Sequence, residues 1–218
     1  MAKRTPYKNE AGARVPSVTG IGPHIEGGAG GLPRWAYGLG LDGKDYDEEM
    51  RRAQDIGTLA HVMIEAEVNR SSVDISEIPD EVTGPATIAM AGFRRWLKDV
   101  RFESLHTEVR MVSEEHQYGG TLDCLARVSG EVALVDWKTS AAVRSAALLQ
   151  VAAYSHAWNE LNPSLPVQHC YVLRLGKNME SFTFHWFPLD GDAMVAAWDA
   201  FLLCRKLYDL SKTLERAV

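Results

Sequence analysis

Cysteine is scarce in this 218-residue sequence, and the shortage excludes two kinds of scaffold. The only three, Cys124, Cys170 and Cys204, are far apart, and none belongs to a Cys-x-x-Cys pair. An odd and scattered set argues against a disulfide framework. It also argues against a four-thiolate zinc or iron–sulfur site built by this chain alone. We therefore expect a cytoplasmic protein, in the host cytoplasm if a phage encodes it.

Long apolar runs, signal segments and internal repeats are absent as well. No stretch approaches the roughly 18 consecutive apolar residues of a membrane-spanning helix, and the N-terminus lacks the basic-then-apolar order of a secretory signal. We expect no membrane partner. The formal net charge of −6 excludes a histone-like polycation. A locally basic groove would still allow the chain to bind nucleic acid.

The sequence contains enough apolar residues to form one hydrophobic core. Hydrophobic residues make up 46% of the chain, which at this length predicts a single domain over residues 45–218. Residues 1–44 are rich in Gly and Pro and should form a partly irregular N-terminal arm, with residues 1–12 as a poorly ordered tail. Trp35 and Tyr37 within the arm would serve as a hydrophobic plug or stack on unpaired bases at a strand end.

The spacing of apolar residues predicts a mixed α/β fold. Helical spacing of three and four predicts helices near 47–70, 85–99, 140–161 and 190–214, the third with Ser140 as its N-cap. Alternating patterns predict strands at 104–112, in a hairpin within 119–140, and at 167–175 and 181–187. The order indicates a mixed central sheet flanked by helices.

The hairpin brings three charged residues together. If Ser129 and Gly130 form a two-residue turn, Asp123 lies directly opposite Asp136, and strand alternation places Lys138 on the same face. Directly opposite residues have Cβ atoms about 4.5–5.5 Å apart. The two carboxylates and the ammonium group should therefore converge at the end of the hairpin away from the turn.

Two neighbouring carboxylates repel each other, and two arrangements would offset the repulsion. One is a divalent cation, since hard oxygen ligands at this spacing suit Mg²⁺ or Mn²⁺. The other is a salt-bridged Asp–Lys–Asp cluster without metal. Gly119 and Gly120 favour the first arrangement, because glycine within a strand is typical of a bulge or of close approach by a ligand.

The motifs "GGTLD" and "VDWKTS" resemble those of the PD-(D/E)xK nuclease superfamily. Within it the chain resembles the RecB-like exonuclease branch, which carries a G-x-x-x-H motif on an upstream helix and a Q-x-x-x-Y motif on the helix after the D-x-K strand. "GTLAH" (Gly57–His61) and "QVAAY" (Gln150–Tyr154) stand in that order, and "RVPSVTGI" (residues 14–21) is similar to the arm of phage members. The resemblance covers roughly residues 14–187 and implies a restriction-endonuclease-like core.

The resemblance also implies a metal site and a catalytic lysine. The metal ligands would be His61, Asp123, Asp136 and the main-chain carbonyl of Trp137, whose side chain should instead pack in the core. Asp123, Asp136 and Lys138 would be the catalytic set. Lys138 would position or deprotonate the attacking water, and both a nearby metal and partial desolvation would lower its pKa towards that of a base.

Four further residues have a role in this hypothesis and a plainer alternative. Gln150 and Tyr154 would contact substrate phosphates or orient the lysine, or else form a partly wetted helix edge. Glu65 lies one helical turn beyond His61 and would be a substrate-positioning carboxylate. Glu108 would hold a second metal or a water, or simply face solvent.

The function implied is metal-dependent DNA exonuclease activity of phage or recombination type, with Mg²⁺ or Mn²⁺ as cofactor and single-stranded or duplex DNA ends as substrate. The shortage of cysteine departs from the iron–sulfur-containing members of the branch and fits the cluster-free ones. A structure-selective flap or junction endonuclease and a catalytically silent DNA-binding or assembly module remain alternatives. A homo-oligomer and a recombination partner protein are also left open, as is the role of a basic run at Arg94, Arg95, Lys98 and Arg101.

Overall fold

The structure is a computed structural model that describes residues 5–22 and 31–217, so residues 1–4 and 23–30 of the expected arm lie outside the described residues. The elements follow in the order α1 (Val18–Ile21), α2 (Gly31–Leu41), α3 (Tyr46–Val68), α4 (Asp80–Asp99), β1 (Phe102–Ser113), β2 (Tyr118–Val128), β3 (Glu131–Lys138), α5 (Ser145–Leu161), β4 (His169–Leu175), β5 (Phe182–Pro188) and α6 (Asp192–Glu215).

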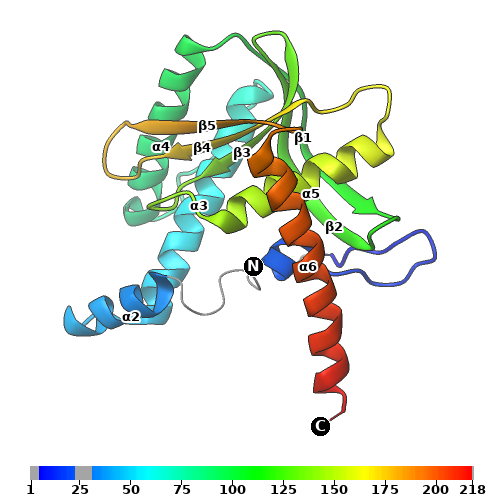
Figure 1. Ribbon diagram of the computed structural model, residues 1–218. Helices are drawn as coiled ribbons and strands as arrows, with labels where there is room; N and C mark the ends of the chain where they lie inside the picture. The colour runs from blue at the N-terminus through cyan, green and yellow to red at the C-terminus, as the bar shows by residue number, and fades with distance from the viewer. Residues whose placement is uncertain (1–4, 23–30, 218) are drawn as a thin grey trace.

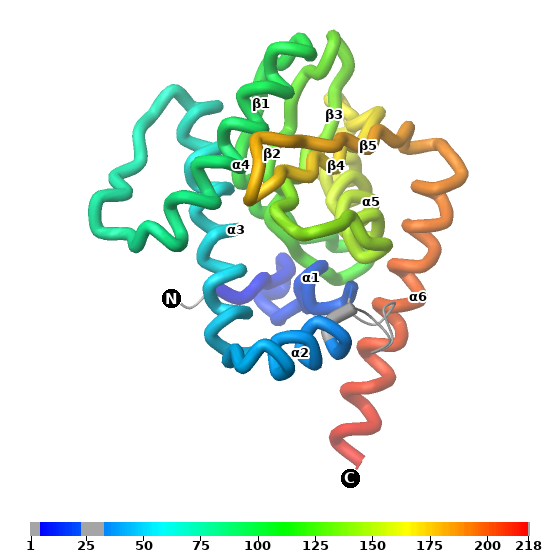
Figure 2. The backbone as a smooth tube through the Cα atoms, turned by 90° about the vertical axis from the view of Figure 1, so that its left-hand side faces the viewer, coloured from blue at the N-terminus to red at the C-terminus, as the bar shows by residue number. Residues whose placement is uncertain are grey.

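One five-stranded sheet forms the centre, with strands in the order β1-β2-β3-β4-β5. Neighbouring strands are antiparallel except β3 and β4, which run parallel and are joined by the crossover helix α5. Helices α3 and α4 pack against each other on one side, and α5 and α6 do so on the other (Figures 1 and 2). The predicted mixed sheet flanked by helices is therefore confirmed.

Each face of the sheet has its own hydrophobic cluster. Under α3 and α4 the centre is aromatic: Trp137 is 2% exposed, and its ring centroid lies 5.2 Å from that of Phe93. The side chain of Trp137 thus packs in the core as expected. Under α5 and α6 the cluster is largely aliphatic and includes Leu122, Leu134 and the fully buried Phe201. The catalytic candidates lie at a sheet end supported from both sides.

The hairpin register follows the two-residue turn. Val128 faces Glu131, and the ladder continues to Cys124 opposite Val135, which confirms the register predicted from the sequence. The paired residues end there, one step before Asp123 and Asp136. Strand β3 continues beside β4 as far as Lys138. The two aspartates therefore lie where β2 and β3 stop pairing.

Two predicted helix starts are wrong. Helix α4 begins at Asp80 and has Pro85 inside it, because acidic residues open its first turn and one proline near the start removes only one hydrogen bond. Helix α5 begins at Ser145 with Arg144 in the N-cap position. Ser140 does not cap it, since its Oγ donates to the carbonyl of Ala142 at 2.8 Å.

Residues 5–15 are attached to the sheet rather than forming a loose tail. Lys8 and Arg14 form an antiparallel bridge, Asn9 Nδ2 donates to Gln117 Oε1 at 2.7 Å, and the Tyr7 hydroxyl lies 2.9 Å from Thr121 Oγ1. For residues 5–12 the predicted disorder is therefore wrong, because local turn bonds and contacts to β2 offset the entropy of ordering them.

The glycines of β2 make room for the protein's own aromatic rings. A Cβ on Gly119 would lie 2.4 Å from Tyr7 Cγ, and one on Gly120 would lie 2.2 Å from Tyr154 Cε1. Both glycines are in regular ladder positions opposite β1. The expectation of a bulge or a ligand at these glycines is therefore wrong.

The three cysteines are all free and buried. No helix in the part of the chain that the structure describes is both long and apolar enough to cross a bilayer.

Candidate active site

His61 reaches the end of β3 from α3. One turn earlier, a Cβ on Gly57 would lie 3.2 Å from Thr139 Oγ1, so glycine allows this helix to approach the sheet closely. His61 Nε2 lies 2.9 Å from the carbonyl oxygen of Trp137. A carbonyl can only accept, so Nε2 carries a hydrogen, and the tautomer with its single hydrogen on Nε2 leaves Nδ1 as an acceptor for another partner.

Two carboxylates lie near the ring of His61. His61 Nδ1 lies 3.6 Å from Asp123 Oδ2. One ligand-capable atom from each of His61, Glu108 and Asp123 falls within 4.8 Å of the other two. Asp123 is held in place because its Oδ2 accepts the main-chain N–H of Trp137 at 2.9 Å. One imidazole nitrogen and two carboxylates form a donor set that suits a divalent cation such as Mn²⁺.

Glu108 enters this group through the register of β1. It lies opposite Asp123, between the paired residues Thr107–Cys124 and Val109–Leu122. Its φ of 49° is in the left-handed region that favours glycine. Backbone strain of this kind in a non-glycine residue persists only where the surroundings enforce it, and such residues cluster at functional sites. Glu108, for which the sequence left a solvent-facing position open, thus belongs to the ligand-capable group.

Asp136 is placed differently from the other acids. It is fully buried, and Lys138 Nζ donates to its Oδ1 at 2.8 Å. Its Oδ2 also lies 2.8 Å from Nζ but makes no hydrogen bond to any residue that the structure describes. Burial raises the pKa of Asp136 to about 6; Lys138 opposes that rise, and Asp123 adds to it. The structure does not bring Asp136 into the group of His61, Glu108 and Asp123.

Lys138 is held as an ammonium group. Burial alone lowers its pKa, as expected, but the carboxylates of Asp136 and Asp123 outweigh burial, and the pKa of Lys138 is raised. The expected shift towards a base is therefore wrong for the protein's own groups. The physical reason is that two acids lie close to one half-buried amine.

Helix α5 continues the polar network. Lys138 Nζ donates to Gln150 Oε1 at 2.9 Å, and Gln150 Nε2 donates to the Tyr154 hydroxyl at 3.2 Å. Tyr154 is 4% exposed, and burial together with the charge of Asp123 raises the pKa of its phenol. Of the two roles considered for this pair, the contacts favour orienting Lys138.

Comparison with known proteins gives a family for this chain. A profile described as the PD-(D/E)XK nuclease superfamily matches residues 34–185. The chain belongs to this superfamily. The match spans more than half of the chain and includes the four motifs and all three residues of the ligand-capable group. A comparison with curated proteins gives no match.

Solved structures resemble this chain distantly. One from Eubacterium rectale, described as a proposed exonuclease, is 11% identical with a TM-score of 0.46. That match covers 68% of this chain and 64% of the other, so this chain spans less than two thirds of that protein. The alkaline exonuclease LHK-Exo from Laribacter hongkongensis is 12% identical with a TM-score of 0.41, covering 76% of this chain and 88% of the other.

Other polar candidates lie outside the group of His61, Glu108 and Asp123. Glu65, one turn from His61, is half-buried and contributes no atom to it. Arg94 of the basic run forms an ion pair with Glu67 at 2.8 Å, and Arg95 donates to the carbonyl of Glu180. Arg94 and Arg95 thus bond to other residues of the protein. This fits a solvent-exposed helix face better than a groove that binds phosphates.

The N-terminal aromatics are divided between packing and exposure. Trp35 meets Tyr46 edge-on at 5.5 Å between ring centroids and is 36% exposed. Tyr37 is 68% exposed. Both rings are therefore exposed, and the two roles considered for them stay predictions.

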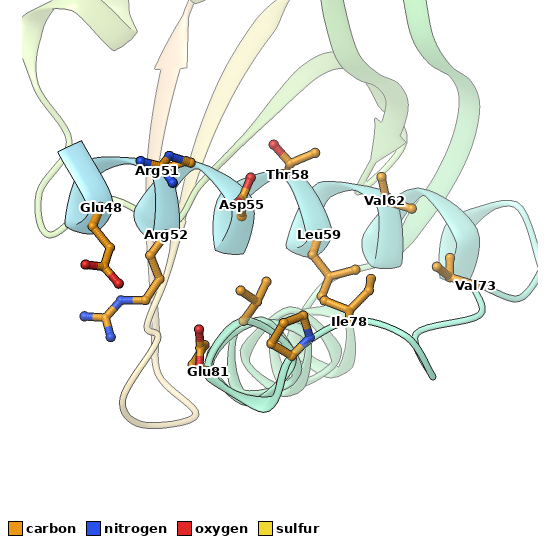
Figure 3. Close-up of a pocket in the computed structure, with 12 residues that line it drawn as sticks. Glu48, Arg51, Arg52, Asp55, Thr58, Leu59, Val62, Val73, Ile78 and Glu81 are labelled. Carbon is orange, nitrogen blue, oxygen red and sulfur yellow. The ribbon is translucent and has the colours of Figure 1, made fainter. Parts of the chain in front are cut away.

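A pocket of about 510 Å³ lies elsewhere on α3, against the segment that leads into α4 (Figure 3). Its floor is apolar, with Leu59, Val62 and Ile78, and its rim mixes acids with Arg51 and Arg52. None of the sequence-predicted site residues lines it. We assign the chemistry to the end of β3, because the convergent ligand atoms and shifted pKa values are there.

Proposed function

We propose that this nuclease is a divalent-metal-dependent DNA exonuclease of the RecB-like branch, of phage or recombination type, and that it acts in the cytoplasm on DNA ends. The observation that carries the proposal is the group formed by His61 Nδ1, Glu108 and Asp123 beside the Asp136–Lys138 pair. Acidic clusters alone are common, but an imidazole beside two acids, with its Nδ1 3.6 Å from Asp123 Oδ2, fits a metal ion.

The residues fit Mg²⁺ or Mn²⁺ by the chemistry of their donors. His61, Glu108 and Asp123 would hold the ion, and the buried Oδ2 of Asp136 offers a further acceptor beside them. The nitrogen ligand favours Mn²⁺ over Mg²⁺ in binding strength, since Mg²⁺ prefers oxygen. When bound, such an ion polarises a phosphate and stabilises the charge that develops during hydrolysis.

The chain's own groups then perform the remaining tasks. Lys138, kept protonated by Asp136 and oriented by Gln150, donates hydrogen bonds to a phosphate oxygen or to the attacking water. A pre-oriented donor of this kind stabilises developing negative charge without reorganisation. Tyr154 holds Gln150 and closes the network on the side of α5. In this proposal Lys138 acts as an electrostatic and positioning group rather than as the base.

The proposed requirement for a DNA end rests on the connections beside the site. The connections around the site are short: six residues, 139–144, join β3 to α5. That leaves little material for the long loops with which a specific endonuclease reads sequence. The flap or junction endonuclease remains the second candidate on the same core, and a homo-oligomer or a partner protein remains a prediction.

The test uses three substrates with Mg²⁺ or Mn²⁺: linear duplex, linear single-stranded and covalently closed circular DNA. An exonuclease converts the linear forms to small products and spares the circle, and Asp123→Asn abolishes that activity. Nicking or linearisation of the circle by the wild type would replace the proposal with an endonuclease. Failure to cut any form, despite measurable Mn²⁺ binding, would favour the silent DNA-binding module.

A further inference from the structure

Arg174 of β4 lies beside the catalytic lysine. In the parallel pairing of β3 with β4, Arg174 is the Cα partner of Lys138. Neighbouring strands are about 4.8 Å apart. Cys170 and Val172 of the same strand pack in the cluster under α5, so alternation places Arg174 on that side too. Lys138 also faces this side, because it bonds Gln150 of α5.

The guanidinium of Arg174 is positioned but not neutralised. Its Nε donates to Thr183 Oγ1 on β5 at 3.2 Å, which fixes the plane of the group. Among residues 5–22 and 31–217 no carboxylate forms an ion pair with it. Arg94 differs, since Glu67 contacts two of its nitrogens. Arg174 therefore keeps its two terminal nitrogens for an acceptor that the described protein does not supply.

Lys177, two residues beyond the end of β4, is a second cation of this kind. It is half-buried, and no described acid pairs with it. The charged group that acts on it is Arg52 of α3, itself paired with Glu49, and burial and that neighbouring charge lower the pKa of Lys177. A partly buried amine beside another cation is costly unless an anion joins them.

We propose that Arg174 and Lys177 form a phosphate-binding site for the DNA strand where it passes from the catalytic centre over the end of β4. Arg174 lies beside Lys138 on the side of α5, and Lys177 follows two residues after β4, at the same end of the sheet as Lys138. The site rests on the proposed function, because it deepens the account of how that centre holds its substrate. Arg174 supplies a rigid fork for phosphate oxygens, and Lys177 supplies a point charge.

Salt dependence provides the measurement, because each phosphate contact releases bound counterions. For single-stranded DNA the slope of log K against log salt changes by about 0.7 per contact. Binding of a fluorescent single-stranded oligonucleotide is followed by anisotropy in EDTA, where no metal supports cleavage. The proteins are the wild type, Arg174→Gln, Lys177→Gln, the double variant and Arg127→Gln. Arg127 is the matched control, because it lies on β2 opposite Val132, at the other end of β3 from Lys138.

The expected result is a slope that is shallower by about 0.7 in each single variant and by about 1.4 in the double variant, with no change in Arg127→Gln. In Mg²⁺ the double variant raises KM several-fold and changes kcat little. Arg174→Lys retains the slope but recovers only part of the affinity, since the fork is lost. Thermal unfolding of each variant is measured alongside, and a folded variant with the wild-type slope overturns the phosphate site.

Failure of the site and failure of the proposed function give different results. If the wild type binds and cuts DNA while the double variant matches it in slope and KM, only the phosphate site is wrong. If the wild type binds the oligonucleotide but cuts nothing with Mg²⁺ or Mn²⁺, the proposed nuclease activity fails, and the slopes still decide the site. If the wild type does not bind the oligonucleotide, the site is overturned as well.

Discussion

At the scale of single residues, the account depends on which acids belong to the metal group. From the sequence we predicted Asp136 as a metal ligand and Glu108 only as a possible ligand of a second metal. In the structure, ligand-capable atoms of Glu108, His61 and Asp123 lie close together and Asp136 pairs with Lys138, so Asp136 as a ligand stays a prediction. The difference is physical: a fully buried carboxylate needs a counter-ion close by, and Lys138 already supplies it.

Removing a member of the group should weaken metal binding. We expect Glu108→Gln and His61→Ala each to reduce Mn²⁺ affinity about tenfold or more, because each deletes one donor. Glu65→Gln should have little effect, since Glu65 contributes no atom to the group. Titration calorimetry with Mn²⁺ measures all three. Equal losses for Glu108→Gln and Glu65→Gln would remove Glu108 from the site.

The buried ion pair should matter for stability as well as for activity. Asp136→Ala leaves Lys138 half-buried without its main partner, and we expect the free energy of unfolding to fall by about 2–4 kcal/mol. The double variant Asp136→Ala/Lys138→Met should recover part of that loss, because it also removes the stranded charge. Urea unfolding at pH 7 gives both values. If Asp136→Ala is as stable as the wild type, the ion pair of Asp136 with Lys138 does not contribute to stability.

At the scale of secondary-structure elements, glycines fix how α5 meets β2. Gly120→Ala would place a methyl group within 2.2 Å of the Tyr154 ring, so the ring or the helix must move. We expect a loss of about 1–3 kcal/mol in stability and a lower kcat, because Tyr154 supports Gln150 and Lys138. Gly38→Ala is the control, since a Cβ on Gly38 in α2 has nothing within 4 Å and should be neutral or slightly stabilising. Chemical denaturation and single-turnover cleavage check both.

The registers of the strands show which parts of the fold could be predicted from the sequence. The turn at Ser129–Gly130 determined the register of the hairpin, because a two-residue turn leaves one pairing. The position of Glu108 depends on a second register, between β1 and β2, where Ser113 pairs with Tyr118 across a four-residue turn. Turns of that length allow several pairings. The hydrogen bond between Lys138 and Gln150 depends on how α5 packs against β3. The spacing of the motifs along the chain predicted the elements on which they lie, but it could not predict this bond.

At the scale of the whole molecule, α6 divides into a packed half and a projecting half. Figures 1 and 2 show its C-terminal end extending beyond the rest of the protein. Phe201 is fully buried, whereas Leu203 and Leu214 are 69% and 68% exposed. Nothing in the described chain covers these two leucines. The fully packed part of α6 therefore ends at about Cys204, and Tyr208 packs partly against the core beyond it.

This division gives a prediction about stability. Phe201→Ala should lower the free energy of unfolding by about 3–5 kcal/mol, because it opens a cavity beside Tyr118, whose ring centroid is 4.8 Å away. Leu203→Ser and Leu214→Ser should each change it by less than about 0.5 kcal/mol. Urea denaturation of the three variants tests the contrast. A loss of more than 1 kcal/mol at Leu214 would show that the projecting half is packed in solution.

The central claim is that His61, Glu108 and Asp123 together hold a divalent cation at the end of β3. Its most direct test is the anomalous difference map of a crystal of the protein soaked in Mn²⁺. The account predicts one strong peak within bonding distance, about 2.0–2.3 Å, of His61 Nδ1 and of a carboxylate oxygen from both Asp123 and Glu108. A well-diffracting soaked crystal with no peak there, or with its strongest peak held by other residues, would contradict it.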